Sequence, residues 1–379
     1  MNTIQNPIWL MSSAYDQLDQ EQLITAAKAA GAQGIDLCVF RTDGTREDHT
    51  ATHLSYENFG TEEAKRTLDK FNAHGLRLSL GAFENMIGGD EAERIKNQNH
   101  LLKLIRIAYL LGGDDNDIKV GTFVGYNHDL GNQIDGFQRN LDEYYRVFAP
   151  IVDYAESLGV TIVYENCPME GWRSSRYTST FNNLPGVLAA RKLMYAMIPS
   201  ASHGEIYDPS HDIWQNTDPV EVIKAMDISR LKRVHVKTTR MRNDTARTQW
   251  GGMYPMQQVD EALAERAGVR TPTNDWDRHH YQAMLPGFGG TDHMDWNNFV
   301  EELHRCHFSG PFEIENEAGN SKDTQNLQAI HQGAASCVRF LAPLLWPLGD
   351  KGYPFSAQEP LKTIQVKDIP VVRMDQLSS

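Results

Sequence analysis

Residues 160–166 have the sequence VTIVYEN, a run of β-branched and aromatic residues that ends in an acid and an amide. Such a run is typical of a parallel strand that is covered on both faces. Seven more runs share this character, and they cover residues 7–13, 34–40, 76–83, 118–125, 204–210, 231–237 and 311–317. Segments with helical spacing of apolar residues separate them. Eight strands, each followed by a helix, predict an α/β fold, a closed (β/α)8 TIM barrel.

Two segments do not fit this simple repeat. About 70 residues separate the last two strands, and we expect the part 238–296 to form a long insertion that shapes or covers the active site. We assign residues 1–345 to the barrel and 346–379 to a proline-containing C-terminal extension. The extension is expected to lie on the barrel or to dock a second copy of the chain or a partner subunit.

Composition and charge exclude several classes of partner. The chain has 379 residues, with 36 Lys and Arg against 50 Asp and Glu, and a formal net charge of −14. This surface and the lack of a basic run argue against nucleic-acid binding. No apolar run reaches the roughly 18 residues of a membrane helix, and the N-terminus lacks the pattern of a secretion signal. Four widely spaced cysteines are typical of reduced thiols, so we expect a cytoplasmic enzyme.

The carboxyl ends of the strands carry an unusual concentration of acids and histidines. In a TIM barrel these ends meet at one mouth, where active sites are built. One such side chain is well explained by a salt bridge or a helix cap. Several buried like charges repel one another unless a cation joins them. Strand alternation places Glu315, of the three glutamates in 313–317, nearest the expected height. The candidate metal ligands are therefore Glu165, Asp208, His235 and Glu315.

Five motifs resemble those of a known family. They are YENCPM (164–169), YDPSHDIW (207–214), HVK (235–237), LPGFGGTDHMDW (285–296) and EIENE (313–317). In this order they resemble the sugar phosphate isomerase/epimerase group of the xylose-isomerase-like TIM barrels, also described as AP endonuclease 2-like barrels. The resemblance covers most of residues 7–345. It implies that the four candidate ligands hold one metal, that Glu165 and Glu315 form a catalytic acid/base pair, and that His211 binds a substrate oxygen.

This ligand set and the resemblance lead to a chemical hypothesis. Three carboxylates and one imidazole favour Mn²⁺ or Mg²⁺, with Co²⁺ or Zn²⁺ as alternatives. We expect proton abstraction next to the carbonyl of a keto-sugar through an enediolate, which gives an isomerase or an epimerase. The alternative is a lyase or deglycosidase that expels a leaving group from a 3-keto-sugar or 3-oxo-glycoside. A third hypothesis is a sugar-binding barrel without activity. Since no glycine-rich phosphate motif is present, the substrate is expected to be unphosphorylated.

Several further residues are weaker candidates for substrate binding: Lys237, Arg240, Trp172, Asn85 and His53. Each also has a structural interpretation. Thr238 replaces the acid that many relatives carry after HVK, so Lys237 either presents its ammonium group to the substrate or pairs with another barrel carboxylate. Cys167 has no histidine near it in sequence and is expected to be a small buried residue. The DRHH cluster at 277–280 matches no compact ligand spacing, so we do not predict a second metal site there.

Overall fold

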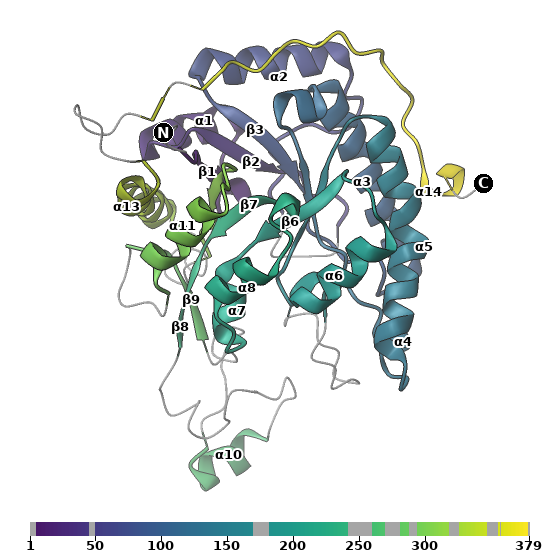
Figure 1. Ribbon diagram of the computed structural model, residues 1–379, viewed down its shortest axis with the longest axis vertical. Helices are drawn as coiled ribbons and strands as arrows, with labels where there is room; N and C mark the ends of the chain where they lie inside the picture. The colour runs from purple at the N-terminus through teal and green to yellow at the C-terminus, as the bar shows by residue number, and fades with distance from the viewer. Residues whose placement is uncertain are drawn as a thin grey trace.

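Eight parallel strands close into a barrel, which confirms the predicted fold class (Figure 1). The computed structural model describes residues 5–44, 50–169, 182–241, 260–269, 281–287, 294–317, 326–346, 355–356 and 358–377. Around the barrel the strands follow the order β1-β10-β7-β6-β5-β4-β3-β2. Their bounds are β1 Ile8–Met11, β2 Gly34–Cys38, β3 Arg77–Gly81, β4 Val120–Thr122, β5 Ile162–Glu165, β6 His203–Tyr207, β7 Leu231–Val236 and β10 Phe312–Ile314.

Helices surround the barrel and cover its outer face, so that six of the strands are buried along their whole length. This burial explains why the strands have continuous apolar sequences and do not alternate. The helices are α1 Gln20–Ala30, α2 Thr61–His74, α3 Glu91–Leu110, α4 His128–Gly131, α5 Gly136–Ser157, α6 Leu188–Met197, α7 Pro209–Trp214, α8 Pro219–Ala225, α10 Glu261–Ala267, α11 Trp296–Arg305, α13 Leu327–Leu345 and α14 Met374–Leu377. In the parts of the chain that could be searched, no helix is long and apolar enough to cross a bilayer.

The barrel interior contains a buried charged layer. The Arg233 guanidinium on β7 lies 3.1 Å from Asp36 Oδ1 and 3.3 Å from Glu313 Oε1. It also donates to the hydroxyl of Ser79 on β3. These four side chains are each at most 1% exposed, and they come from four strands. Arg233 precedes His235 by two residues on β7, and Glu313 on β10 precedes Glu315 by two residues, so this layer lies directly beneath the barrel mouth.

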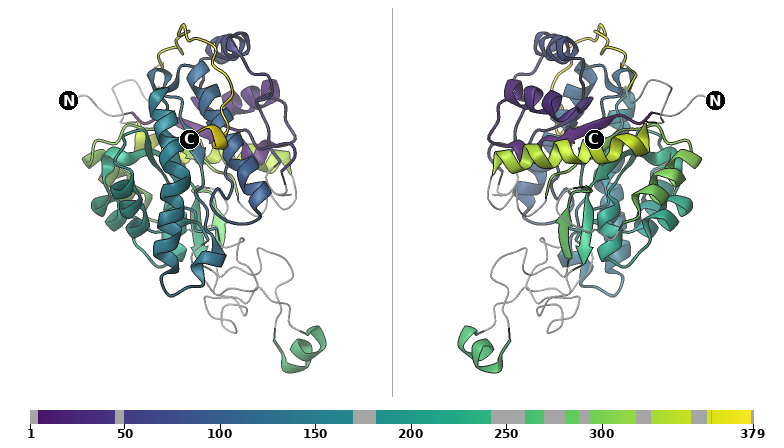
Figure 2. Two further views of the ribbon diagram at one scale, coloured as in Figure 1. Left: turned by 90° about the vertical axis from the view of Figure 1, so that its right-hand side faces the viewer. Right: turned by 90° about the vertical axis from the view of Figure 1, so that its left-hand side faces the viewer.

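The insertion begins with a β-hairpin, where the sequence predicted a loop. Strand β8 (Thr238–Met241) pairs antiparallel with β9 (Tyr281–Met284), and Thr238 lies opposite Met284. The two strands are far apart in sequence, so no short turn signals the pairing. Only Lys237 separates β7 from β8. Helix α10, also in the insertion, stands away from the barrel (Figure 2).

Residues 358–377, the C-terminal strap, first cross the amino-terminal end of the barrel, opposite the mouth, and then run down its outer side to α14 (Figure 1). The backbone of Leu361 exchanges two hydrogen bonds with the side chain of Asn72, at 2.7 and 2.8 Å. The backbone of Lys362 makes the same pair with Asn116, both at 2.8 Å. The strap ends in α14, which packs on α3 and α5. Docking of another subunit through this segment stays a prediction.

The strap is expected to contribute to the stability of the barrel. Leu361 is 3% exposed, so Leu361→Ala should lower the free energy of unfolding by about 2 kcal/mol or more. Val371 lies on the same strap and is 47% exposed, so Val371→Ala should cost less than about 0.5 kcal/mol. Urea denaturation followed by circular dichroism measures both. Equal losses in the two variants would contradict the docking of Leu361.

Candidate metal centre

Four side chains from four consecutive positions around the barrel meet at its mouth. Glu165 ends β5, Asp208 follows β6, His235 lies on β7 and Glu315 follows β10. One ligand atom from each lies within 4.8 Å of the others, and all four residues are buried. The structure thus brings together the predicted ligand set, although it does not test whether these residues bind a metal.

The Asp208 and Glu165 positions are fixed by two asparagines. Asn166 donates from Nδ2 to Asp208 O at 3.0 Å and accepts from Asp208 N at 2.7 Å, which locks β5 and β6 together at their ends. Asn183 donates to the carbonyl oxygens of Glu165 and Cys167 at 3.2 and 2.7 Å. Sequence reasoning assigned neither asparagine a role. Asn166 is adjacent to a predicted ligand, whereas nothing in the sequence around Asn183 indicates its function.

His235 lies at the centre of the cluster. Its Nδ1 atom is 3.0 Å from Glu315 Oε2 and 3.4 Å from Glu165 Oε1, while Nε2 faces Glu313 Oε2 at 3.6 Å. No directed hydrogen bond from the described residues reaches Nδ1, which is buried. A buried imidazole nitrogen that faces two carboxylates without a directed hydrogen bond suits coordination of a cation through Nδ1.

Phe83 closes the floor of the site against His235, with ring centroids 6.4 Å apart. The phenyl ring fits only because two neighbouring positions lack a side chain. A Cβ atom on Gly81 would lie 2.8 Å from Phe83 Cε2, and one on Gly121 would lie 2.9 Å from Cζ. These glycines therefore allow an aromatic ring to keep water away from one side of the imidazole.

Lys237 is part of the cluster. Its Nζ atom lies 2.9 Å from Asp208 Oδ2, 2.8 Å from Glu315 Oε2 and 2.9 Å from Glu317 Oε2. The structural interpretation of Lys237, pairing with barrel carboxylates, is the arrangement observed. Thr238 in place of an acid does not leave the lysine without a partner, because neighbouring strands supply three carboxylates. A role in substrate binding stays a prediction.

Burial and the neighbouring positive charges shift the pKa values of the three carboxyl groups in opposite directions. Burial raises the pKa of Glu165, but the positive charges of His235 and Lys237 outweigh it, and this pKa is about 2. Burial raises the pKa of Asp208 too, yet Lys237 and nearby imidazoles hold it well below its usual value. In Glu315 burial prevails, so its pKa is raised although Lys237 lowers it. The two glutamates therefore differ in how readily they take a proton.

A family model matches most of the chain. Residues 24–339 match the family model described as xylose isomerase-like TIM barrel. The chain belongs to this family. The match confirms the resemblance found in the five motifs. A sequence search of curated proteins gives no significant match.

Solved structures share the barrel at low sequence identity. L-ribulose 3-epimerase has a TM-score of 0.55 and 15% identity, over 90% of this chain and 94% of that chain. The probable 3-DHS dehydratase AsbF from Bacillus anthracis has a TM-score of 0.55 and 14% identity, over 88% and 98%. The IOLI protein with a bound zinc atom has a TM-score of 0.55 and 15% identity, over 89% and 98%. At identities this low, the likeness shows a common fold.

His211 lies beside the cluster as a hydrogen-bond donor. Trp214 Nε1 donates to His211 Nδ1 at 3.3 Å, so in the neutral ring the hydrogen is carried by Nε2. Nε2 lies 3.1 Å from Asp208 Oδ2 and 3.6 Å from Glu165 Oε1. Glu165, Cys167 and His211 also form a group with metal-ligand spacing. The thiol is half-buried and close to an imidazole, which corrects our expectation for Cys167, but the Trp214 bond disfavours Nε2 as a ligand.

Two predicted substrate contacts are occupied by protein groups. His53 is 5% exposed, with Nδ1 2.9 Å from Ser12 Oγ and Nε2 3.0 Å from Tyr15 O. The Asn85 side chain stabilises its own turn, because Oδ1 accepts from Gly88 N at 2.8 Å. Both side chains thus have structural roles, and the geometry adds no support for a contact with substrate.

The remaining candidates lie in the insertion or outside the described residues. Arg240 lies on β8 and donates to Gln282 on β9, so its guanidinium holds the hairpin together. Trp172 and the cluster at 277–280 lie outside the residues that the structure describes. Their predicted roles, including the absence of a second metal site at 277–280, stay predictions.

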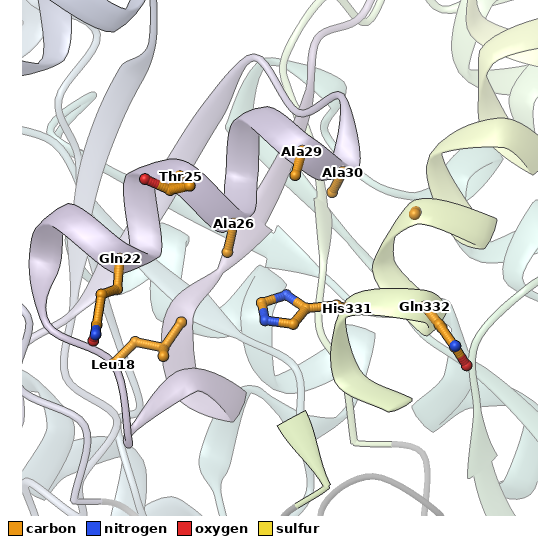
Figure 3. Close-up of a pocket in the computed structure, with 9 residues that line it drawn as sticks. Leu18, Gln22, Thr25, Ala26, Ala29, Ala30, His331 and Gln332 are labelled. Carbon is orange, nitrogen blue, oxygen red and sulfur yellow. The ribbon is translucent and has the colours of Figure 1, made fainter. Parts of the chain in front are cut away.

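A separate groove lies on the outside of the barrel between α1 and α13, with a volume of about 510 Å³ (Figure 3). Ala26, Ala29 and Ala30 line one side, and His331 points into it from the other. His331 is the one ionisable side chain among the lining residues, so the groove offers apolar contact and lacks the carboxylates of the mouth.

The affinity for a divalent cation is expected to rise with pH. Burial lowers the pKa of His235, but the charges of Glu165 and Glu315 outweigh it and raise this pKa well above its usual value. The metal-free imidazole is therefore protonated at neutral pH, whereas a metal ligand must be neutral. Affinity should rise about tenfold per pH unit until this pKa is reached.

Titration calorimetry in two buffers of different ionisation enthalpy measures the protons released. We expect about one proton per cation from the wild type. The His235→Asn variant should bind the cation more weakly and without this release. Binding by the wild type with no proton release would contradict ligation by His235.

Proposed function

We propose that the protein is a divalent-metal-dependent sugar isomerase or epimerase that abstracts a proton next to a carbonyl group. The gathering of Glu165, Asp208, His235 and Glu315 within 4.8 Å carries this proposal. Buried acids this close together favour the binding of a cation. The shared fold with L-ribulose 3-epimerase, at 15% identity, supports a sugar as the class of substrate.

The donor set fits a hard divalent cation. Three of the four ligand atoms are carboxylate oxygens, which favours Mn²⁺ or Mg²⁺, with Co²⁺ or Zn²⁺ as alternatives. The IOLI protein, which shares this fold, binds a zinc atom, and this supports a bound metal in the present protein. When bound, such a cation polarises a carbonyl group and stabilises negative charge on its oxygen.

The two glutamates are suited to opposite steps of proton transfer. Glu165, with its pKa of about 2, is ionised at neutral pH, as a general base must be. Glu315, whose pKa is raised by burial, is the better donor. Two carboxyl groups whose surroundings push their pKa values apart are the usual arrangement of an acid/base pair. His211 presents its Nε2 hydrogen to the same space and would orient a substrate oxygen.

The charges at the mouth favour an uncharged, unphosphorylated keto-sugar. Lys237 is already paired with carboxylates, and Arg240 is held by Gln282. A phosphate group would need cations or backbone N–H groups that are not committed in this way.

A lyase is the second candidate. The same enolising site expels a leaving group when one stands β to the carbonyl, and the probable 3-DHS dehydratase shares the barrel at a TM-score of 0.55. The β8–β9 hairpin, which begins one residue after β7, adds an extra wall beside the mouth. The substrate would then be a 3-keto-sugar or a 3-oxo-glycoside.

Incorporation of deuterium tests the proposed chemistry. The metal-loaded protein, incubated in D₂O with a panel of keto-sugars, should introduce deuterium at the carbon next to the carbonyl. Glu165→Gln and Glu315→Gln should each lower the rate by about 10²- to 10⁴-fold, since each removes one member of the acid/base pair. Mass spectrometry and proton NMR measure the exchange, and elemental analysis measures the metal.

The matched control is Glu221→Gln on α8, an exposed glutamate paired with Lys224, which should keep the wild-type rate. A deuterated epimer or isomer supports the leading proposal, whereas an unsaturated product supports the lyase. Metal and sugar binding with no exchange in any protein would overturn both and leave a sugar-binding barrel.

A further inference from the structure

Lys237 holds a position that a metal ion would be expected to take. Its side chain is 3% exposed, and Nζ lies within 2.9 Å of three carboxylate oxygens. A buried ammonium group with three carboxylate partners is fully compensated, so it gives this crowded set of acids the positive charge that it needs. In the metal-free protein, Lys237 therefore offsets part of the negative charge of the cluster.

The three partners of Lys237 are of two kinds. Asp208 and Glu315 belong to the predicted ligand set, and Lys237 contacts one oxygen of each. Glu317 lies outside that set and nearer to solvent, with a side chain that is 23% exposed against 7% for Glu315. The lysine thus connects the ligands to a carboxylate at the rim.

A divalent cation and this ammonium group compete for the same oxygens. A cation bound to Asp208 and Glu315 would have the charge of Lys237 a few ångströms away, in a buried site where charges are poorly screened. The contact with Glu317, at 2.9 Å, is the one that does not involve a predicted ligand. Glu317 therefore offers the ammonium group a negative partner that is not one of the predicted ligands.

The main chain on both sides of Lys237 is held firmly. Thr238 and Thr239 pair with β9, and Thr239 Oγ1 donates to Ser210 O at 3.0 Å. On the other side of Lys237, the main chain of His235 belongs to β7, which pairs with β6 and β10. Any adjustment of Lys237 is therefore confined to its side chain.

We propose that Lys237 is the resident counter-cation of the empty ligand set, and that it withdraws to Glu317 when a divalent cation binds. This inference rests on the proposed function, because it takes Asp208 and Glu315 as ligands. Lys237 is a positioning residue in this scheme. It keeps the acids together without metal, and its withdrawal opposes metal binding.

Lys237→Met tests the scheme, because methionine keeps much of the side-chain volume and removes the charge. Lys232→Met is the control, since Lys232 lies near the start of β7 and its Nζ atom donates to Ser229 O at 2.6 Å. Calorimetry with Mn²⁺ and thermal unfolding with and without Mn²⁺ are measured on the full chain.

Lys237→Met should bind Mn²⁺ at least about tenfold more tightly than wild type. Its metal-free form should unfold about 5 °C lower or more, and its Mn²⁺-saturated form near wild type.

Glu317→Gln has the opposite expected effect on affinity. It removes the partner to which Lys237 withdraws, so Mn²⁺ binding should weaken by about tenfold. If metal-free Lys237→Met does not fold, both proteins are purified with Mn²⁺ bound, and the rate at which a chelator removes the Mn²⁺ is measured in place of the titration. Lys237→Met should lose its Mn²⁺ more slowly than the wild type.

The outcomes separate this inference from the proposed function. Weaker or unchanged Mn²⁺ binding by Lys237→Met would overturn the counter-cation, and an unchanged Glu317→Gln would overturn the withdrawal. In both cases the metal site of the wild type would stand. A wild type that binds no divalent cation would overturn the proposed function, and this inference with it.

Discussion

Carboxylates buried inside a barrel need positive charge beside them, and this requirement organises the centre of the molecule. Arg233 meets it in the lower layer, between Asp36 and Glu313. Lys237 meets it at the mouth. Loss of one partner from a buried ion pair typically costs about 3–5 kcal/mol, because the other charge is left without compensation. The order of strands around the barrel is what brings each cation to its acids, so fold and charge balance depend on each other.

The sequence predicts the barrel well, because its evidence is local. Each buried strand is an apolar run such as VTIVYEN, and in the helix after it the apolar residues recur every three or four positions. The hairpin and the strap depend on distant pairings. Thr238 meets Met284, and Asn72 holds the backbone of Leu361, 289 positions further on. Every residue except proline offers the same main-chain donor and acceptor, so the sequence does not indicate which residue will receive such a hydrogen bond.

The candidate site was predictable to the extent that strand ends must converge. That reasoning predicts that Glu165, Asp208, His235 and Glu315 lie together, and their ligand atoms lie within 4.8 Å of one another. It could not show that Trp214 selects the tautomer of His211, since that depends on the side-chain direction in α7. Nor could it show that His53 is enclosed by Ser12 and Tyr15.

The strap and the mouth lie at opposite ends of the barrel, and this separation has an evolutionary consequence. Residues 358–377 reinforce the amino-terminal end through contacts such as Asn116 with Lys362, none of which involves the acids of the mouth. Substitutions at the mouth that lower the free energy of unfolding can be tolerated when contacts at the other end make the fold more stable than it needs to be. Descendants of such a chain are free to acquire new substrates by changing the mouth alone, while the strap keeps the scaffold folded.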